Sequence, residues 1–366
     1  MEPYIPDTLP LNMSALYTTE LVKLLSDSIA SLAKYNGIMT NPSLSPSVFL
    51  SPLEAKEAVL SSKIEGTMTT LDDVLRFDAD VFTGNKDGDI VEVLNYRTAM
   101  RDAKRWLDKG YPINKTVICE IQKTLLQDVR GQNKKPGEIR KEQVWIGTYN
   151  STIENAQYVP PAPTNVLNFL DNLIEYMNSD DQEPLIQTAV MHAQFEIIHP
   201  FMDGNGRTGR ILIPLFLWSK NRLDSPMFYI SEYLETNRAE YTKHLQGITS
   251  NKDWYSWIRF FLQAIRDQAA KNSQKALAII SLYEDYKDRL LSEQNSQNSV
   301  RGLDVLFSMP IFSAVQFRKA ANMTPQTAAR VLSAYKQLGF IETVSPKSGR
   351  TSELLIFPAL YRLINE

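Results

Sequence analysis

The stretch from His199 to Arg210 constrains this chain more than any other. It reads His-Pro-Phe-Met-Asp-Gly-Asn-Gly-Arg-Thr-Gly-Arg and separates two segments, 183–198 and 211–216, whose apolar residues suit buried helices. A polar, glycine-rich loop between buried helices is an unusual thing to build for stability alone, because its backbone and charged groups need partners. We therefore expect a mainly α-helical protein whose functional site is built on this loop.

The first residue of the stretch has the properties of a base. Proline disfavours the α conformation in the residue before it, so the preceding helix is expected to end at His199. The dipole at a helix C-terminus favours the protonated imidazole and raises its pKa. A base with a pKa near neutrality suits removal of a proton from an alcohol.

The rest of the stretch suits a polyphosphate. The Gly-Asn-Gly turn at 204–206 lets the backbone approach an anion, and the helix that follows directs free N–H groups at it. Arg207 and Arg210 are three residues apart, so both should project from one face of that helix, matched to phosphate oxygens. Asp203 is the kind of ligand that Mg²⁺ takes together with phosphate oxygens.

Each of these residues also has an ordinary structural explanation. His199 could bond to backbone, Asp203 could cap the next helix, the glycines could form a tight turn, and the arginines could pair with surface acids. Taken singly, those explanations are the better ones. A base, a metal ligand, an anion-binding turn and paired arginines in one register together favour a phosphate-handling site.

The stretch resembles the signature of the Fic (filamentation induced by cAMP) family. That signature is His-Pro-Phe, any residue, Asp or Glu, Gly-Asn, Gly or Lys, Arg, two free residues and Arg, and every specified position matches. The resemblance implies a Fic-fold helical bundle that moves AMP from ATP to a hydroxyl of a target protein. It also implies that His199 is the catalytic base and that Asp203 holds Mg²⁺. The ATP-binding residues that it implies are Gly204, Asn205, Gly206, Arg207, Arg210 and, from its position after the signature, Tyr241.

A second stretch, Ser61-Ser-Lys-Ile-Glu65-Gly66, has two interpretations. Composition alone favours the exposed end of an amphipathic helix. The stretch is also similar to the inhibitory motif of many Fic proteins, which is Ser or Thr, three residues, Glu, then Gly or Asn. Its place ahead of the signature is the arrangement called class II. The resemblance implies that Glu65 pairs with Arg210 and keeps it from the γ-phosphate. Breaking a buried, bidentate pair of this kind costs about 3–5 kcal/mol.

Apolar periodicity and capping signals divide most of the remaining chain into helices. We expect helices over 18–35, 54–65, 88–108, 114–128, 165–177, 183–198, 232–245 and 254–291. Thr70–Asp73 reads as a capping box, and 41–52 as a Pro/Ser-rich connection. Short β-type runs at 144–149 and 156–159 predict a β-hairpin. By resemblance this hairpin, which contains Trp145 and Tyr158, is the family's flap, which registers a target backbone by strand addition.

The last segment, 300–366, has its own organisation. Two helices, over 313–321 and 324–338, are expected on either side of a tight turn. They are followed by strands at 340–344 and 354–357, which flank a turn at Lys347–Arg350. This order predicts a winged helix-turn-helix. Eight basic and four acidic residues give the segment a net charge of +4, within a chain whose total is −3. The charge permits DNA binding without requiring it, since winged helices also bind proteins.

Composition sets the remaining limits. The net charge of −3 gives no overall reason to expect nucleic acid or an anionic membrane as partner. The single cysteine, Cys119, cannot form an internal disulfide, and the N-terminus lacks the pattern of a signal peptide. No apolar run reaches the ~18–20 residues of a membrane span. We expect a cytoplasmic protein with no membrane partner.

These observations predict four parts. They are an N-terminal helical region with the inhibitory helix (1–110), a Fic domain with the flap (111–291), a polar linker (292–299) and the winged helix-turn-helix (300–366). The favoured function is a self-inhibited protein adenylyltransferase that uses Mg²⁺ and ATP and modifies protein targets, itself included. Three alternatives stay open: a Fic enzyme that removes AMP or transfers another phosphate group, a DNA-binding regulator whose Fic domain senses nucleotide, and a structural interaction protein. A homodimer also stays open.

Overall fold

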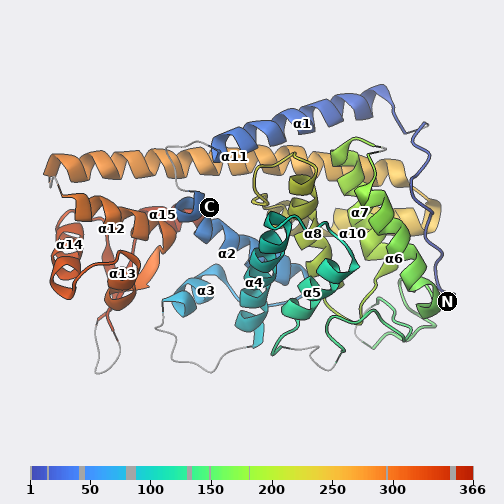
Figure 1. Cartoon of the computed structure of the whole chain (residues 1–366), viewed down its shortest axis with the longest axis horizontal. Coiled ribbons are helices and arrows are strands. Elements are labelled where there is room, and N and C mark those ends of the chain that lie inside the picture. Colours follow the sequence, from blue (N-terminus) through green and yellow to red (C-terminus); the bar gives the residue numbers. More distant parts are fainter. Residues whose placement is uncertain are drawn as a thin grey trace. The chain divides into compact units, whose positions relative to one another are not determined.

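The computed structural model describes residues 2–14, 16–40, 46–79, 88–129, 134–147, 150–180, 182–293, 296–346 and 352–365. Within these ranges the chain is mainly helical and contains one small sheet (Figure 1), which confirms the expected fold class. The helices are α1 (Thr19–Met39), α2 (Pro46–Ile64), α3 (Leu71–Asp78), α4 (Gly88–Asp108), α5 (Lys115–Leu125), α6 (Pro163–Asn178), α7 (Pro184–Ile198), α8 (Asn205–Ser219), α9 (Ser231–Thr236), α10 (Arg238–Asn251), α11 (Trp254–Glu293), α12 (Gln297–Ser308), α13 (Ala314–Ala320), α14 (Pro325–Gln337) and α15 (Pro358–Asn365). The strands are β1 (Ile311–Ser313), β2 (Glu342–Ser345) and β3 (Leu354–Ile356).

Local signals placed most helices correctly. The capping box at Thr70 is present, because its hydroxyl accepts from the Asp73 backbone N–H at 3.2 Å and its own N–H donates to the Asp73 carboxylate at 2.9 Å. Two expectations are wrong. The connection at 41–52 is helical from Pro46, since proline is tolerated in the first turn of a helix. The linker at 292–299 is helical from Gln297, because the apolar face of α12 is buried and draws its polar first turn into the helix.

The chain forms two compact units that interleave in sequence. Unit 1 contains Met1–Asn36, Leu60–Thr67 and Leu94–Ala270, and unit 2 contains Gly37–Val59, Met68–Val93 and Lys271–Glu366. Helices α1, α2, α4 and α11 therefore contribute residues to both. Because the units are not consecutive pieces of chain, the four-part division expected from sequence order stays a prediction.

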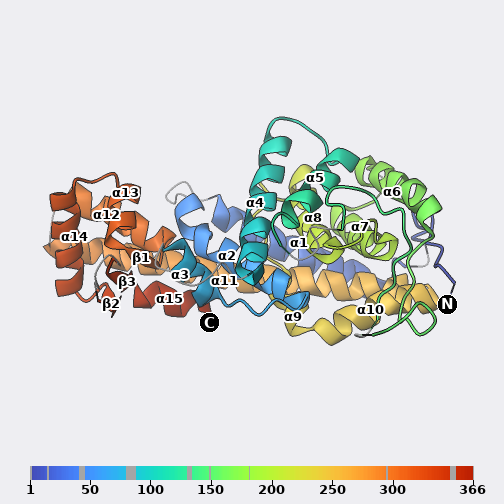
Figure 2. The same ribbon diagram turned by 90° about the horizontal axis from the view of Figure 1, so that it is seen from below.

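Unit 1 is organised around α7 and α8, which pack against each other and are buried along almost their whole length. Helices α5 and α6 pack beside them (Figure 2). The loop that joins α7 to α8 is the His199–Gly204 part of the signature. The fold thus holds a polar loop between the two most buried helices of the unit, as the flanking apolar segments predict.

Unit 2 contains the predicted helix-turn-helix as α13 and α14, with Ser313 and Thr324 as their N-caps. The strands form an antiparallel sheet in the order β1-β3-β2, in which Leu355 of β3 pairs with Phe312 on one side and Thr343 on the other. The sequence did not suggest β1. The predicted turn at Lys347–Arg350 lies outside the described residues, and the name winged helix stays an interpretation of this arrangement.

Candidate active site

The turn after α7 fixes the position of the predicted base. Helix α7 ends at Ile198, and His199 takes the left-handed conformation with φ of 49° as its C-cap. The His199 backbone N–H still donates to the carbonyl of Phe195 at 3.0 Å. The helix therefore ends where the following proline predicts, with the imidazole at its last turn.

Arg140 holds this turn from outside and was missed by the sequence reasoning. Its guanidinium donates to the backbone carbonyls of His199 at 2.8 Å, Pro161 at 2.6 Å and Ile198 at 3.3 Å. Arg140 is only 2% exposed. Nothing in the local sequence distinguishes this arginine from surface arginines, because its acceptors lie about 20 and 60 residues further along the chain.

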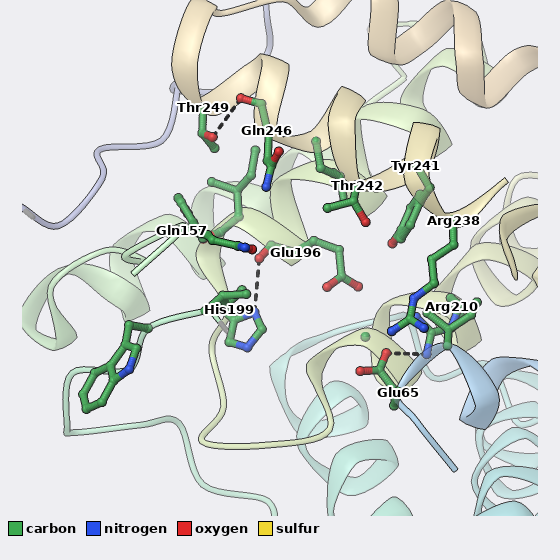
Figure 3. Close-up of a pocket in the computed structure, with 18 residues that line it drawn as sticks. Glu65, Gln157, Glu196, His199, Arg210, Arg238, Tyr241, Thr242, Gln246 and Thr249 are labelled. Atoms are coloured by element: carbon green, nitrogen blue, oxygen red, sulfur yellow. Dashed lines mark hydrogen bonds and ion pairs between the residues drawn. The ribbon is translucent and has the colours of Figure 1, made fainter. Parts of the chain in front are cut away.

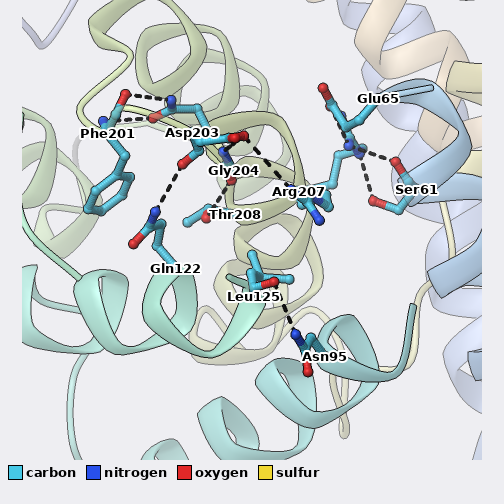
Figure 4. Close-up of polar contacts among 12 residues, drawn as sticks. Ser61, Glu65, Asn95, Gln122, Leu125, Phe201, Asp203, Gly204, Arg207 and Thr208 are labelled. Carbon is cyan, nitrogen blue, oxygen red and sulfur yellow. Dashed lines mark hydrogen bonds and ion pairs between the residues drawn. The ribbon is translucent and has the colours of Figure 1, made fainter. Parts of the chain in front are cut away.

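Two amides hold the rest of the loop (Figure 4). The buried side chain of Asn205 closes a pair of hydrogen bonds with the backbone N–H and carbonyl of Phe201, both at 2.9 Å. Gln122 of α5 donates to the carbonyl of Asp203 at 2.9 Å. The Asn205 side chain is thus held in the loop by both its oxygen and its nitrogen, and its backbone N–H remains a donor for an anion.

The helix that follows is suited to an anion at its first turn. Gly204, with φ of 76°, is the N-cap of α8, and the first N–H groups of a helix have no intrahelical partner. Asp203 lies just ahead of this turn. Its Oδ1 accepts from the Gly204 N–H at 2.6 Å and lies 3.9 Å from Nη2 of Arg207, and 43% of its side chain is exposed.

Arg210 is held by the end of α2 and by the residue that follows it. Its Nε donates to the Ser61 hydroxyl at 2.8 Å, and its Nη2 donates to the Ser61 carbonyl at 2.8 Å and to Oε1 of Glu65 at 2.7 Å. The structure therefore places Glu65 beside Arg210, as the family resemblance implies. Gly206 makes this approach possible, because a Cβ there would lie 2.2 Å from Oε1 of Glu65.

The ion pair differs from the expected one in two respects. Only one carboxylate oxygen of Glu65 contacts the guanidinium, so the pair is not bidentate. Arg210 is 1% exposed at its side chain, but Glu65 is 39% exposed. Solvent screens a half-exposed pair, so the cost of breaking it is lower than the range expected for a fully buried one. Burial raises the pKa of Glu65, but the charge and hydrogen bond of Arg210 outweigh this effect and hold the pKa below its ordinary value.

A pocket of about 490 Å³ brings the site together. Of the residues predicted from the sequence, seven line it: Glu65, Trp145, Tyr158, His199, Gly206, Arg210 and Tyr241. Five do not line it: Ser61, Asp203, Gly204, Asn205 and Arg207. Figure 3 shows side chains of α7 and α10 converging on the space beside Arg210 and Glu65. The volume is that of an ordinary small-molecule site.

The pKa of His199 departs from the expectation. Burial lowers it to about 4, and the Glu196 carbonyl, 3.3 Å from Nδ1, acts in the opposite direction. The prediction that the helix dipole raises this pKa is wrong, because desolvation of the imidazolium outweighs the dipole. The imidazole is therefore neutral at physiological pH, as a base must be before it accepts a proton.

Tyr241 is buried and faces the pocket from α10. Its hydroxyl lies 2.9 Å from Nε2 of His192, and its ring stacks on that imidazole. Burial lowers the pKa of His192 to about 3, so this partner is neutral. The contact fixes the ring of Tyr241, and its suggested place near an adenine stays a prediction.

Glu196 is a further pocket residue that the sequence reasoning missed. Burial raises its pKa to about 8, although Arg210 acts in the opposite direction. It lies three residues before His199 on α7, and this spacing on a helix was the available signal.

The flap is less regular than expected. The predicted hairpin consists, among the described residues, of a single antiparallel bridge between Ile146 and Tyr158. The Ile146 N–H donates to the Tyr158 carbonyl at 2.8 Å, and the Tyr158 hydroxyl donates to the Ile197 carbonyl at 2.7 Å. Trp145 is 44% exposed. The hydrogen bond of Tyr158 therefore attaches the flap to α7, and Trp145 is partly exposed to solvent.

Among the described helices, none combines the length and the apolar character that crossing a bilayer needs.

Comparison with known proteins identifies the relatives of this chain. Residues 22–105 match the model of the Fic/DOC family N-terminal region, and 112–217 match that of the Fic/DOC family. A probable protein adenylyltransferase of Aquifex aeolicus is 24% identical over 196 residues, which cover 52% of this chain and 56% of that protein. The protein adenylyltransferase Fic of Drosophila grimshawi is 30% identical over 172 residues, 46% of this chain and 32% of that protein. The chain thus spans about half, or less, of the length of these relatives.

Solved structures agree on the fold. A Fic family protein from Desulfovibrio desulfuricans matches with a TM-score of 0.60 and 18% identity over 97% of this chain and 98% of its own. The signature loop, the helices that hold it and the two family models, which together span more than half of the sequence, lead to one conclusion: the chain belongs to the Fic/DOC family.

Proposed function

We propose that this protein transfers AMP from ATP to a hydroxyl group of a protein substrate. The observation that carries the proposal is the meeting of His199, the first turn of α8 and the buried Arg210 at one pocket. Relatives that share this region are named protein adenylyltransferases.

His199 supplies the base. Its Nδ1 faces a carbonyl oxygen, which can only accept a hydrogen bond, so the proton of the neutral ring belongs on Nδ1 and the lone pair on Nε2. A Ser, Thr or Tyr hydroxyl of the substrate gives its proton to Nε2 while its oxygen attacks the α-phosphorus. The bond from that phosphorus to the leaving pyrophosphate breaks, and AMP remains on the hydroxyl.

The first turn of α8 and two arginines hold the phosphates. Gly204 lets the backbone approach the phosphate oxygens, and the backbone N–H groups of Asn205, Gly206 and Arg207 cradle them. Arg210 orients the γ-phosphate. Tyr241 borders the space left for the nucleoside.

The residues present fit a magnesium ion. Both contacts of the Asp203 carboxylate involve Oδ1, and the side chain is 43% exposed, so it can offer an oxygen to a metal. No cluster of three or more His, Cys, Asp or Glu side chains in the described ranges could hold one, so phosphate and water oxygens would complete the shell. The ion would neutralise charge on the α- and β-phosphates.

Glu65 inhibits this activity by occupying Arg210. While Arg210 donates to Ser61 and Glu65, its guanidinium is not available to a γ-phosphate, and the α-phosphate is poorly presented to an attacking hydroxyl. The same carboxylate could instead position a water for removal of AMP, and this is the alternative chemistry that the geometry leaves.

Labelling with ATP that carries a radioactive α-phosphate tests both the AMP transfer and its inhibition by Glu65. The Glu65→Gly variant should label itself about tenfold more than wild type or better, because each ~1.4 kcal/mol of released bias raises the competent population tenfold. His199→Ala in the same background should abolish labelling. Equal labelling of variant and wild type would contradict inhibition by Glu65. Loss of label from a pre-modified substrate would favour AMP removal.

A second candidate function concerns unit 2. Helix α14 contains no acidic residue, and Arg330 is exposed on it together with Ser333 and Lys336. An exposed basic helix after a helix-turn suits the major groove of DNA. We propose DNA binding as a separate activity of this helix.

A further inference from the structure

Glu196 has a carboxyl group with no assigned task. Its side chain points from α7 into the pocket (Figure 3), and its Oε1 is buried without a hydrogen-bond partner among the described residues. A Cβ at Gly209 would lie 2.4 Å from this oxygen. The carboxyl group of Glu196 therefore lies against the backbone of α8 at Gly209, the residue before Arg210.

Arg210 needs a negative partner in every state of the protein. Its guanidinium is almost fully buried and does not lose its proton. In this structure the partner is Glu65, the residue that follows α2. Any relief of inhibition removes that carboxylate, and a buried charge left without a partner is strongly destabilising. Glu196 is a second carboxylate whose charge acts on Arg210.

We propose that Glu196 is the second counter-ion of Arg210: it has no charge partner while Glu65 holds the guanidinium, and it takes the guanidinium when Glu65 leaves. The inference rests on the proposed inhibitory role of Glu65 and not on the AMP transfer itself. Glu196 thereby acts as a positioning residue that keeps Arg210 in the pocket until a γ-phosphate arrives.

The electrostatics of the cluster agree with this exchange. Burial raises the pKa of Glu196 to about 8, with Arg210 lowering it and Glu65 raising it, so the carboxyl is protonated at neutral pH in the present state. When Glu65 leaves, a negative charge beside Glu196 is lost and the positive charge of Arg210 is left without its partner. Both changes lower the pKa of Glu196. The other titratable or charged groups that line this pocket are His199 at the end of α7, Tyr158 of the flap, and Arg238 and Tyr241 on α10. His192 on α7 lies behind them against Tyr241.

Infrared difference spectroscopy at neutral pH tests the proposal directly. The carbonyl stretch of a protonated carboxylic acid is compared in wild type, Glu65→Gln, Glu196→Gln and the double variant. Glu196→Gln is the matched control that assigns the band, because Glu183 also has a pKa raised by burial. We expect the Glu196 band in wild type and its loss in Glu65→Gln. A band present in both, or absent from both, overturns the proposal.

A thermal double-mutant cycle gives a second readout. Glutamine has the shape of a protonated glutamate, so Glu196→Gln should change the Tm of wild type little, but it should lower the Tm of Glu65→Gln by several degrees. Equal shifts in the two backgrounds overturn the proposal. Neither measurement uses catalysis, so a failure here leaves the proposed AMP transfer standing, and a failure of AMP transfer leaves these outcomes unchanged.

Discussion

Arg140, which lies outside the signature, supplies hydrogen-bond donors to the turn at His199. Backbone carbonyls at the end of a buried helix need donors, and the left-handed turn directs those of Ile198 and His199 away from the helix. One guanidinium serves both of them and the carbonyl of Pro161. The position of the base therefore depends on a residue some sixty positions earlier.

Replacing this arginine should destabilise the protein. Arg140→Ala leaves at least three buried carbonyls without their charged donor, which should lower the free energy of unfolding by about 3 kcal/mol or more. Denaturant titration measures the change. Arg105→Ala is the control, because Arg105 is 64% exposed and its pairing with Asp102 on α4 contributes little. A loss below about 1 kcal/mol for Arg140→Ala would contradict the proposed role.

The pKa of His199 predicts the pH dependence of the proposed transfer. With a pKa of about 4, the imidazole keeps its lone pair at every pH well above that value. The rate of the Glu65→Gly variant should therefore be flat between about pH 6 and 8 and fall only as the pH approaches 4. Circular dichroism at each pH controls for unfolding. A rate that falls with a midpoint near 6.5, the value of an ordinary histidine, would contradict the assignment.

At the level of helices, the proposed inhibition involves the end of α2 as well as Glu65, the residue that follows it. Ser61 accepts two of the three hydrogen bonds that Arg210 donates to the end of α2 and the residue after it, one at its hydroxyl and one at its backbone carbonyl. Lys63 adds an ion pair to Glu235 at 3.2 Å, but 56% of its side chain is exposed, so this pair contributes little. The end of α2 is thus a short segment whose side chain and backbone both bind the same guanidinium.

Neighbouring serines of α2 separate these contributions. Ser61→Ala removes one hydrogen bond to a charged group, so self-labelling should rise by roughly three- to tenfold, less than for Glu65→Gly. Ser62→Ala is the matched control, because the Ser62 hydroxyl is buried without a hydrogen-bond partner in the described structure. Labelling that is equal in the two serine variants would argue against a role for the Ser61 hydroxyl.

For the protein as a whole, the proposed DNA binding can be tested separately from the transfer. Lys336 is a poor probe because it pairs with Glu353 at 2.7 Å. Arg330→Ala should weaken DNA retention and reduce the slope of log K against log salt by about 1, as expected for one lost phosphate contact. Lys23→Ala, on the exposed side of α1, is the control. AMP transfer should be unchanged, and an unaltered salt slope would exclude Arg330 from a DNA interface.

Much of this protein follows from local sequence. Helix bounds come from apolar period and capping residues, so α4 and the capping box of α3 were predictable to the residue. The end of α7 follows from the proline after His199. The signature itself predicts a base, a metal ligand and an anion-binding helix start within twelve residues, because each task needs a particular residue type at a fixed spacing.

The rest depends on contacts between segments that are distant in sequence. The pKa values of His199 and Glu196 are set by burial, which no local pattern specifies. Arg140 cannot be told from a surface arginine until its carbonyl acceptors are packed around it. The partners of Arg210 lie at the end of α2 and just after it, 149 and 145 residues earlier in the chain. Only the tertiary structure shows that Ser61 accepts two hydrogen bonds from Arg210, whereas Glu65, whose side chain is 39% exposed, accepts one. The sequence alone determines which residue types occur in the signature. The tertiary packing determines how much water and charge surround each side chain, and these surroundings set its pKa.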